Sequence, residues 1–326
     1  MKRLLPLLVL TACPTAPQFP ETAPENACVA GAIQSGEQLL RIDVAGKTRQ
    51  ALIWMPEVDG PYSIVMNLHS FRSEPRRVAH YMGLVEWAKD KPIIIIGADG
   101  KTATWNAGEC CGKAKDRDYP DVEFLDTVIA HVESVACTTG EVTASGLGNG
   151  AFMAHRWACE SDAPDALITA GGTLQAESCS RTRPLPVLHY HGTEDGYAPA
   201  DGSMGHRTAE YGLALWRDIN GVTGEPTVTS DGELSCQSWT GTAPVTYCTV
   251  EGGFHGWPGA QDMPVVTEMV LGQATPNGYD WLDAARVVMT TPSANDDAVE
   301  PGLATDPAGA VENALEPGVD SEEGAH

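Results

Sequence analysis

The chain has 326 residues, 42% of them hydrophobic, and a formal charge of −24 at neutral pH. That length and apolar content suffice for one large domain with its own core. A charge this negative argues against nucleic acid or an anionic membrane surface as the main partner, because both attract basic patches.

The N-terminus is typical of an export signal. Two basic residues precede an apolar run over 4–10, which is far too short to span a bilayer. The run ends in Leu-Thr-Ala-Cys, which resembles the bacterial lipoprotein box, where the cysteine is lipidated. We expect a lipoprotein signal peptide over 1–12, lipidation of Cys13 and a Pro-rich tether over 13–34. The alternative is an ordinary secretory peptide, so the chain is expected to be exported, either lipid-anchored at the outer or cell-surface membrane of a bacterium or secreted.

Strand-like and helix-like segments alternate over 35–290, which predicts an α/β fold built on a mostly parallel, doubly wound sheet. The expected strands are 39–44, 51–55, 62–68, 93–96, 142–145, 166–170, 187–191 and 247–250. The first two form a hairpin around Ala45-Gly46. Helical spacing is clear over 122–135 and also appears over 78–87, 151–159 and 279–288. No repeat or second domain is evident, so we expect a single domain.

The last segment, 291–326, differs in composition from the rest. It contains nine acidic residues among Pro, Gly and Ala, with no aromatic residue, Lys or Arg. Such a segment cannot bury enough apolar surface to offset its ordering entropy. We expect a disordered acidic tail without chemistry of its own.

Eight cysteines remain after Cys13, and an even number in an exported chain is typical of disulfides. Connectivity does not follow from sequence. The pairing we favour joins Cys159 to Cys179 and Cys236 to Cys248, and gives Cys28 and Cys137 one each of the doublet Cys110-Cys111. A structural zinc site is the weaker alternative, because the chain lacks a pair of CxxC knuckles. We expect no bound metal.

One strand runs directly into a glycine-rich turn and then a helix. The turn is Gly146-Leu147-Gly148-Asn149-Gly150, which has the context of the nucleophile elbow, whose motif is G-x-S-x-G. Side chains at the two outer positions would collide with the neighbouring strand and helix, and glycine occupies both. The nucleophile position between them is Gly148.

An acid and a base follow in the order expected of an α/β-hydrolase. Asp195 comes just after the strand 187–191, and His255 comes after the last strand. In that arrangement His255 is the general base, while Asp195 fixes its tautomer and stabilises the imidazolium.

Several segments carry a resemblance to one family: residues 105–108 (Trp-Asn-Ala-Gly), 110–112 (Cys-Cys-Gly), 121–125, 150–159, 191–195 and 255–259. Together they resemble the polyhydroxybutyrate-depolymerase and feruloyl-esterase group of α/β-hydrolases, over about 49–259. The resemblance implies a secreted serine esterase that needs no cofactor. Its implied substrates are hydroxycinnamoyl or acetyl esters on plant polysaccharides, or polyesters. Asp195 and His255 match the acid and base, and the nucleophile maps to Gly148.

Gly148 is the first departure from the family pattern. Without a hydroxyl or thiol at this position, the usual acyl-enzyme mechanism is closed. We considered Ser145 and Ser203 as substitutes. Ser145 lies within the strand and Ser203 in a loop after the acid, so neither has the strand–turn–helix context. Glycine tolerates the strained backbone of an elbow, so the replacement preserves the fold.

Ser70 is the second departure, since Leu68-His69-Ser70-Phe71 stands where the family has Leu-His-Gly. This loop is expected to supply one oxyanion-hole N–H, from Ser70 or Phe71, and Asn149 the other. Serine in place of glycine puts that geometry in doubt.

Four other side chains are candidates for binding. Trp105 and Trp257 form either a stacking platform for an aromatic or sugar ligand, or packing within long loops; the sequence does not decide between these. His189 and His191 alternate along a strand and could share a metal, but structural positions are favoured because no further ligand lies at suitable spacing.

These observations favour a pseudoenzyme: a surface lipoprotein that retains the cleft of a carboxylesterase and binds a polysaccharide-linked aromatic or acetyl ester, or a polyester fragment, without cutting it. The alternative is residual hydrolysis by a water that His255 and Asp195 activate. A purely structural surface lipoprotein is a further alternative. Contact with the membrane is expected through the lipid anchor only.

Overall fold

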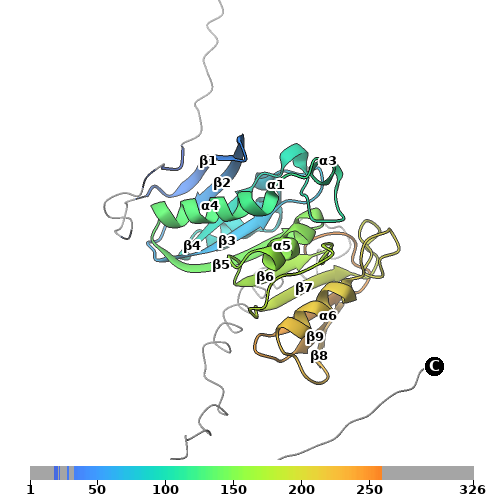
Figure 1. Ribbon diagram of the computed structural model, residues 1–326. Helices are drawn as coiled ribbons and strands as arrows, with labels where there is room; N and C mark the ends of the chain where they lie inside the picture. Colours follow the sequence, from blue (N-terminus) through green and yellow to red (C-terminus); the bar gives the residue numbers. More distant parts are fainter. Residues whose placement is uncertain (1–17, 21, 23–27, 29–32, 259–326) are drawn as a thin grey trace, which may run out of the picture. The chain divides into compact units, whose positions relative to one another are not determined.

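The computed structural model describes residues 18–20, 22, 28 and 33–258. The predicted signal peptide, Cys13, the helix 279–288 and the acidic tail therefore lie outside the described residues. A ten-stranded sheet forms the centre, in the order β1-β2-β4-β3-β5-β6-β7-β10-β9-β8 (Figure 1). Among the described residues, no helix combines the length and apolar content needed to cross a bilayer.

The middle of the sheet is parallel and its two margins are antiparallel. The parallel strands are β4 (Ile93–Ala98), β3 (Tyr62–Leu68), β5 (Thr138–Leu147), β6 (Ala166–Ala170), β7 (Val187–Gly192) and β10 (Val245–Val250). The hairpin of β1 (Gly36–Val44) and β2 (Lys47–Met55) adds antiparallel strands at one edge. At the other edge lie β9 (Leu234–Trp239) and β8 (Thr227–Asp231), which the sequence did not predict. The predicted mostly parallel α/β-hydrolase sheet is confirmed.

Helices cover both faces of the sheet. The residues of α4 (Asp121–Val135), α5 (Asn149–Glu160) and α6 (Ala209–Ile219) pack in one buried cluster. Those of α1 (Pro75–Tyr81) and α2 (Leu84–Ala88) pack in the other. Two short elements, η1 (Lys101–Ala103) and α3 (Gly112–Asp116), lie in the loops after β4.

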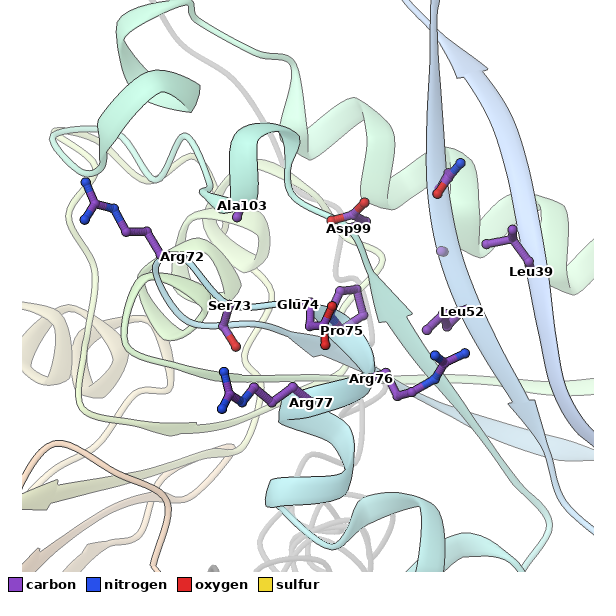
Figure 2. A pocket seen from close by; sticks show the side chains of 12 residues that line it. Leu39, Leu52, Arg72, Ser73, Glu74, Pro75, Arg76, Arg77, Asp99 and Ala103 are labelled. Carbon is purple, nitrogen blue, oxygen red and sulfur yellow. The ribbon is translucent and has the colours of Figure 1, made fainter. Parts of the chain in front are cut away.

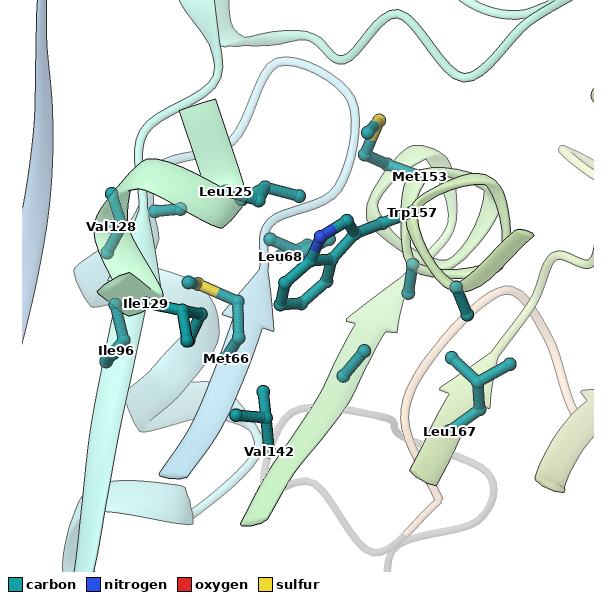
Figure 3. Close-up of a cluster of buried hydrophobic side chains, with 14 of the residues drawn as sticks. Met66, Leu68, Ile96, Leu125, Val128, Ile129, Val142, Met153, Trp157 and Leu167 are labelled. Carbon is teal, nitrogen blue, oxygen red and sulfur yellow. The ribbon is translucent and has the colours of Figure 1, made fainter. Parts of the chain in front are cut away.

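Strand alternation explains how one sheet supplies two cores. Along β3, Ile64, Met66 and Leu68 belong to the cluster beneath α4 and α5, while Val65 faces the other cluster. Figure 3 shows Met66 and Leu68 beside Leu125 of α4 and Trp157 of α5. Each such buried side chain contributes about 1.5–3 kcal/mol, so these contacts fix α5 and the turn before it on the sheet.

The disulfides confirm two predicted pairs and correct the rest. Cys159–Cys179 and Cys236–Cys248 are formed as expected. However, Cys28 pairs with Cys137, and Cys110 pairs with its neighbour Cys111. The correction follows from chain path: Cys28 reaches the start of β5, with a Cα–Cα distance to Cys137 of 4.8 Å, and the doublet is left to pair with itself.

Part of the expected tether is packed against the domain. Phe19 is 3% exposed, donates its N–H to Leu39 O and packs edge-on against His131. Pro20 O lies 3.1 Å from His131 Nε2. Phe19 and Pro20 therefore contact the folded domain, while the domain boundaries themselves stay a prediction.

Candidate active site

The strand–turn–helix expected around Gly148 is present. Gly148 has φ 57° and ψ −119° and separates β5 from α5. A Cβ on Gly146 would lie 2.5 Å from Gly150 backbone atoms, and one on Gly150 would lie 2.0 Å from Leu68 O. The outer glycines of the turn are thus required by close backbone approach, as the elbow motif predicts.

The space in front of Gly148 is occupied by two polar side-chain atoms. An ideal Cβ at residue 148 would lie 2.6 Å from His255 Nε2 and 2.7 Å from Ser70 Oγ. Both distances are shorter than van der Waals contact. His255 Nε2 and Ser70 Oγ therefore occupy the space that a side chain at residue 148 would need.

Asp195 and His255 are brought together from two loops. His255 Nδ1 lies 2.7 Å from Asp195 Oδ2. Asp195 Oδ1 accepts the backbone N–H groups of Tyr197 at 2.9 Å and Ala198 at 2.8 Å. Burial alone would raise the pKa of Asp195, but hydrogen bonds from His191 and His255 outweigh it and hold that pKa below its ordinary value. An ionised Asp195 requires a proton on Nδ1 of His255, which leaves Nε2 as the base facing Gly148.

A chain of buried polar groups continues behind Asp195. Its contacts are Trp216 Nε1 to His155 Nδ1 (2.8 Å), His155 Nε2 to Thr169 Oγ1 (3.1 Å), Thr169 Oγ1 to His189 Nδ1 (2.9 Å), His189 Nε2 to His191 Nδ1 (3.1 Å), and His191 Nε2 to Ala198 O (2.8 Å). His191 Nε2 also lies 3.5 Å from Asp195 Oδ2.

We call these five side chains (Trp216, His155, Thr169, His189 and His191) the histidine chain. An indole N–H can only donate, so Trp216 fixes the proton of His155 on Nε2. His155 then donates to Thr169, which donates to Nδ1 of His189. The proton of His189 is therefore on Nε2 and is donated to Nδ1 of His191, which donates in turn from Nε2 toward Ala198 O and Asp195. Burial lowers the pKa of His155 to about 3 and that of His189 well below its usual value, so both rings are neutral. The structural role favoured for His189 and His191 agrees with this geometry; among the described residues, no cluster of three or more potential ligands could hold a metal.

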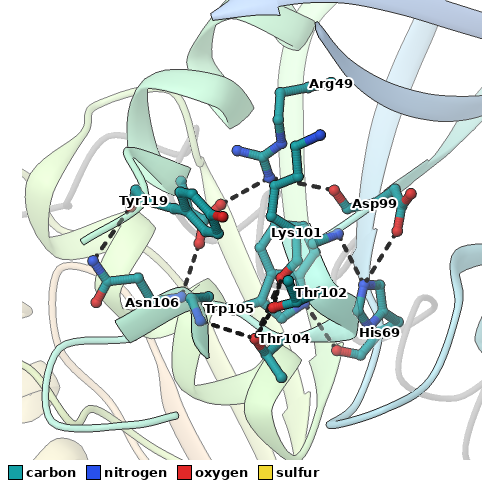
Figure 4. Close-up of polar contacts among 12 residues, drawn as sticks. Arg49, His69, Asp99, Lys101, Thr102, Thr104, Trp105, Asn106 and Tyr119 are labelled. Atoms are coloured by element: carbon teal, nitrogen blue, oxygen red, sulfur yellow. Dashed lines mark hydrogen bonds and ion pairs between the residues drawn. The ribbon is translucent and has the colours of Figure 1, made fainter. Parts of the chain in front are cut away.

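The loop carrying Ser70 is held by a second buried network. His69 Nε2 accepts the N–H of Gly100 at 2.9 Å, so the proton of His69 sits on Nδ1, which lies 2.9 Å from Ser70 O. Trp105 Nε1 donates to His69 O at 3.0 Å. Burial lowers the pKa of His69 to about 4 and keeps the ring neutral. Figure 4 shows His69, Trp105 and Asp99 in this network.

Asn149 connects the same network to the elbow. Its side chain accepts the N–H of Trp105 at 2.7 Å and donates to Trp105 O at 3.2 Å. The backbone N–H of Asn149, at the start of α5, has no partner within the helix, because the first N–H groups of any helix lack one. Its expected part in an oxyanion hole stays a prediction, as does that of Phe71 in the facing loop.

The two tryptophans do not form a stacking platform. Trp105 is 0% exposed and stacks on Phe124, while Trp257 is 1% exposed and packs near Tyr190. The long loops that carry them fold inward, so both rings are core. The exposed aromatic side chains that share a cavity lining with His255 are instead Phe71 (44%) and Tyr197 (78%), neither of which the sequence identified as a stacking residue.

A cavity of about 480 Å³ lies between the elbow and the dyad. Its lining includes Gly148, Asn149, His255, Ser70, Phe71, Phe152, Tyr197, His206 and the disulfide Cys110–Cys111. A larger cavity of about 700 Å³ lies elsewhere and is bordered by Arg72, Arg76 and Arg77 (Figure 2). Gly148 and His255 line only the smaller of these two cavities, so we place the candidate site there.

The chain is similar in sequence to two feruloyl esterases. No protein-family model matches the chain. It is 28% identical over 182 residues to feruloyl esterase B of Piromyces equi, covering 50% of this chain and 33% of that protein. It is 27% identical over 154 residues to a probable feruloyl esterase C of Aspergillus clavatus, covering 44% and 52%. The matches therefore span between a third and about half the length of these curated relatives.

Solved structures share the fold at low identity. An acetyl xylan esterase from Aspergillus awamori superimposes with a TM-score of 0.56 at 12% identity, covering 76% of this chain and 99% of that one. A thermostable esterase gives 0.53 at 12% identity, covering 76% and 62%. The fold is that of the α/β-hydrolases. With the two sequence relatives, these similarities support an esterase-like member of that fold.

Proposed function

We propose that this chain binds carboxylic esters in the 480 Å³ cavity and that residue 148 contributes no covalent step, which makes the elbow that of a pseudoenzyme. The single observation that carries the proposal is the His255–Asp195 contact of 2.7 Å, aimed at a glycine that holds the nucleophile's place. The pair belongs to the site and not to the fold as such, so it supports an assignment of function more directly than the sheet does.

The lining favours an ester with an aromatic or sugar portion. Phe71 and Tyr197 offer exposed ring faces, and the ring of Tyr197 meets that of His255 edge-on at 5.6 Å. Ring faces of this kind pack against planar or sugar groups. Names of the relatives, feruloyl esterase and acetyl xylan esterase, support hydroxycinnamoyl or acetyl esters of polysaccharides as the ligand class, with a polyester fragment as the alternative.

Hydrolysis without residue 148 is the second candidate function. It is favoured by His255 Nε2, which faces the vacated space and is the only ring nitrogen left to act as a base once Nδ1 is bound to Asp195. A water activated there would attack the ester directly. Enzymes stripped of a triad member retain about 10³–10⁴-fold acceleration over water from binding and the oxyanion hole.

Export is part of the proposal. Four disulfides are formed among the described residues, and disulfides persist in oxidising compartments. We infer a lipid anchor at Cys13 or release by secretion. Replacing Cys13 with Ser and following metabolic labelling with a palmitate analogue tests the anchor; an unchanged label contradicts it.

The test of binding is calorimetric titration of the purified chain with methyl ferulate, run beside hydrolysis of p-nitrophenyl acetate. We expect saturable binding that weakens at least tenfold in Tyr197→Ser and is unchanged in Val228→Ser, an exposed residue of β8 outside the cavity. Turnover that disappears in His255→Ala would support the second candidate. Absence of both binding and turnover would favour a purely structural surface protein.

A further inference from the structure

The two departures from the family pattern meet in space. Ser70 Oγ and His255 Nε2 flank one point, the ideal Cβ position of residue 148, at 2.7 and 2.6 Å. The two atoms are therefore separated by no more than the sum of those distances. We propose that Ser70 is the nucleophile of this protein, with His255 as its base. This proposal rests on the proposed ester-binding function of the same cavity.

Hydrogen bonds hold the backbone of Ser70 in place. Its carbonyl accepts the Nδ1–H of His69 at 2.9 Å and the N–H of Ser73 at 3.1 Å. His69 is 0% exposed and is itself fixed by Gly100 N and by Trp105 Nε1. These bonds fix the backbone of Ser70, and with it the position from which its hydroxyl reaches the space in front of Gly148.

The same geometry explains why the chain carries a glycine at the elbow. A side chain at residue 148 would overlap Ser70 Oγ, so the site has room for one of the two groups. The loss at position 148 and the gain at position 70 are then one exchange: the hydroxyl has moved from the turn before α5 to the loop after β3.

The reaction balances with ester and water alone. Ser70 Oγ bonds to the ester carbonyl carbon as its proton passes to His255 Nε2, and Asp195 stabilises the imidazolium. The bond from carbon to the alcohol oxygen breaks, and His255 returns the proton to that oxygen. Water then gives a proton to His255 and attacks the acyl carbon. Ser70 Oγ leaves and regains its proton, which releases the carboxylic acid.

The hydrogen-bond donor for the oxyanion is expected at the start of α5. Asn149 lines the cavity, and its N–H is among those that a helix leaves unpaired. Partial positive charge at a helix N-terminus favours the tetrahedral oxyanion.

Covalent labelling tests the assignment directly. The full chain is treated with p-nitrophenyl diethyl phosphate, which phosphorylates activated serines, and the adduct is located by peptide mass spectrometry. Ser70→Ala and His255→Ala are compared with Ser73→Ala, a matched change three residues away that leaves the cavity lining intact. Methyl ferulate binding is measured on each variant to report an intact cleft.

We expect the adduct on Ser70, its loss in Ser70→Ala, at least a 100-fold slower labelling in His255→Ala, and no change in Ser73→Ala. Turnover of p-nitrophenyl acetate should follow the same pattern. No adduct on Ser70, or turnover unchanged in Ser70→Ala, overturns the assignment. If methyl ferulate still binds in that case, the ester-binding function stands; if it does not bind, both fail.

A swapped variant supplies the positive control. Gly148→Ser combined with Ser70→Gly restores the family arrangement and should move the phosphoryl label to position 148. A label that forms there but never on Ser70 of the natural chain would show a competent cleft in which Ser70 is inert, and would overturn the assignment.

Discussion

The two sides of the cleft differ in how far they depart from an esterase. On the dyad side, Asp195 and His255 keep a 2.7 Å contact, and the histidine chain behind them orders every proton as far as Trp216. On the elbow side, the strand–turn–helix is present, with Gly148 and Ser70 at the positions where the family pattern predicts serine and glycine. The expected acid–base contact is therefore formed, whereas residue 148 offers no nucleophilic atom.

The difference lies in how each side is built. The dyad side depends on a continuous buried network, so a single replacement there leaves a neighbouring donor or acceptor without a partner, which costs about 1–3 kcal/mol. At the elbow side, the altered atoms line an open cavity and are supported through backbone contacts. Side chains there can change while the scaffold stays.

Acid should produce the largest loss of stability, two thirds of it on the dyad side. His155 and His189 of the histidine chain and His69 behind the elbow-side loop are buried and neutral, with pKa values lowered to about 3, well below 6.5, and about 4 respectively. The unfolded chain binds protons on all three from about pH 6.5 downward while the folded chain does not, so stability falls as pH falls through that window. Near pH 5 the loss approaches about 4 kcal/mol per pH unit, since each histidine contributes about 1.4. Urea midpoints at pH 7, 6 and 5 measure it.

Two variants sharpen that experiment. His189→Gln should remove about a third of the slope, whereas His80→Gln, at an exposed position, should leave it unchanged. Stability that stays flat between pH 6.5 and 4.5 would contradict neutral burial of these rings.

Among single substitutions, we expect the largest loss of unfolding free energy in the buried ion pair that supports the elbow side. Arg49 and Asp121 form a 2.8 Å ion pair that is almost fully buried, and Asp121 also accepts the N–H of Asn106 at 2.8 Å. Removing one partner leaves a buried charge, so Asp121→Ala should lower the free energy of unfolding by about 3–5 kcal/mol. The exposed pair of Arg217 and Glu210 is the control: Glu210→Gln should cost less than about 1 kcal/mol. Equal effects of the two variants in denaturant titrations would refute the argument.

The sequence was sufficient for the parallel centre of the sheet. Strands β3 and β6 begin and end where their apolar runs predict, because both are buried on two faces. The hairpin of β8 and β9 was missed because every residue of β8 is exposed, which leaves no apolar alternation to detect. Disulfide pairing of the doublet depended on chain path, which sequence does not contain.

At the site, sequence order located Gly148, Asp195 and His255 because each follows a strand at the same edge of the sheet. For Ser70 the sequence predicted a backbone N–H donor of the oxyanion hole and a departure from the family pattern, but no role for its hydroxyl. Its importance depends on which way its hydroxyl points, toward a residue 78 positions later, and no local pattern encodes that. Trp105 and Trp257 were equally ambiguous, since burial of a loop side chain is a tertiary property.

A substitution at Trp216 tests whether this residue sets the tautomers of the histidine chain on the dyad side. Trp216→Phe keeps the packing but removes the only donor to His155 Nδ1, so we expect a loss of about 1–3 kcal/mol and a redistribution of tautomers along the histidine chain. Nitrogen-15 NMR of the imidazoles measures the tautomers directly. Trp239→Phe, at a partly exposed tryptophan of β9, should leave those spectra unchanged. Identical spectra in wild type and Trp216→Phe would show that Trp216 does not set the chain's direction.

The smallest effect we predict is the coupling free energy between positions 148 and 70 on the elbow side. Gly148→Ala places a Cβ 2.7 Å from Ser70 Oγ and 2.6 Å from His255 Nε2, at a backbone φ of 57° that L-residues rarely adopt. The backbone strain persists in any background, but crowding against Ser70 disappears once Ser70 is Gly. A double-mutant cycle of Gly148→Ala and Ser70→Gly should therefore yield a favourable coupling of about 1 kcal/mol, because both crowding atoms end flexible side chains that can partly move aside. Thermal unfolding of the four proteins measures it. A coupling of zero would contradict the crowding that the 2.7 Å distance from an added Cβ to Ser70 Oγ predicts.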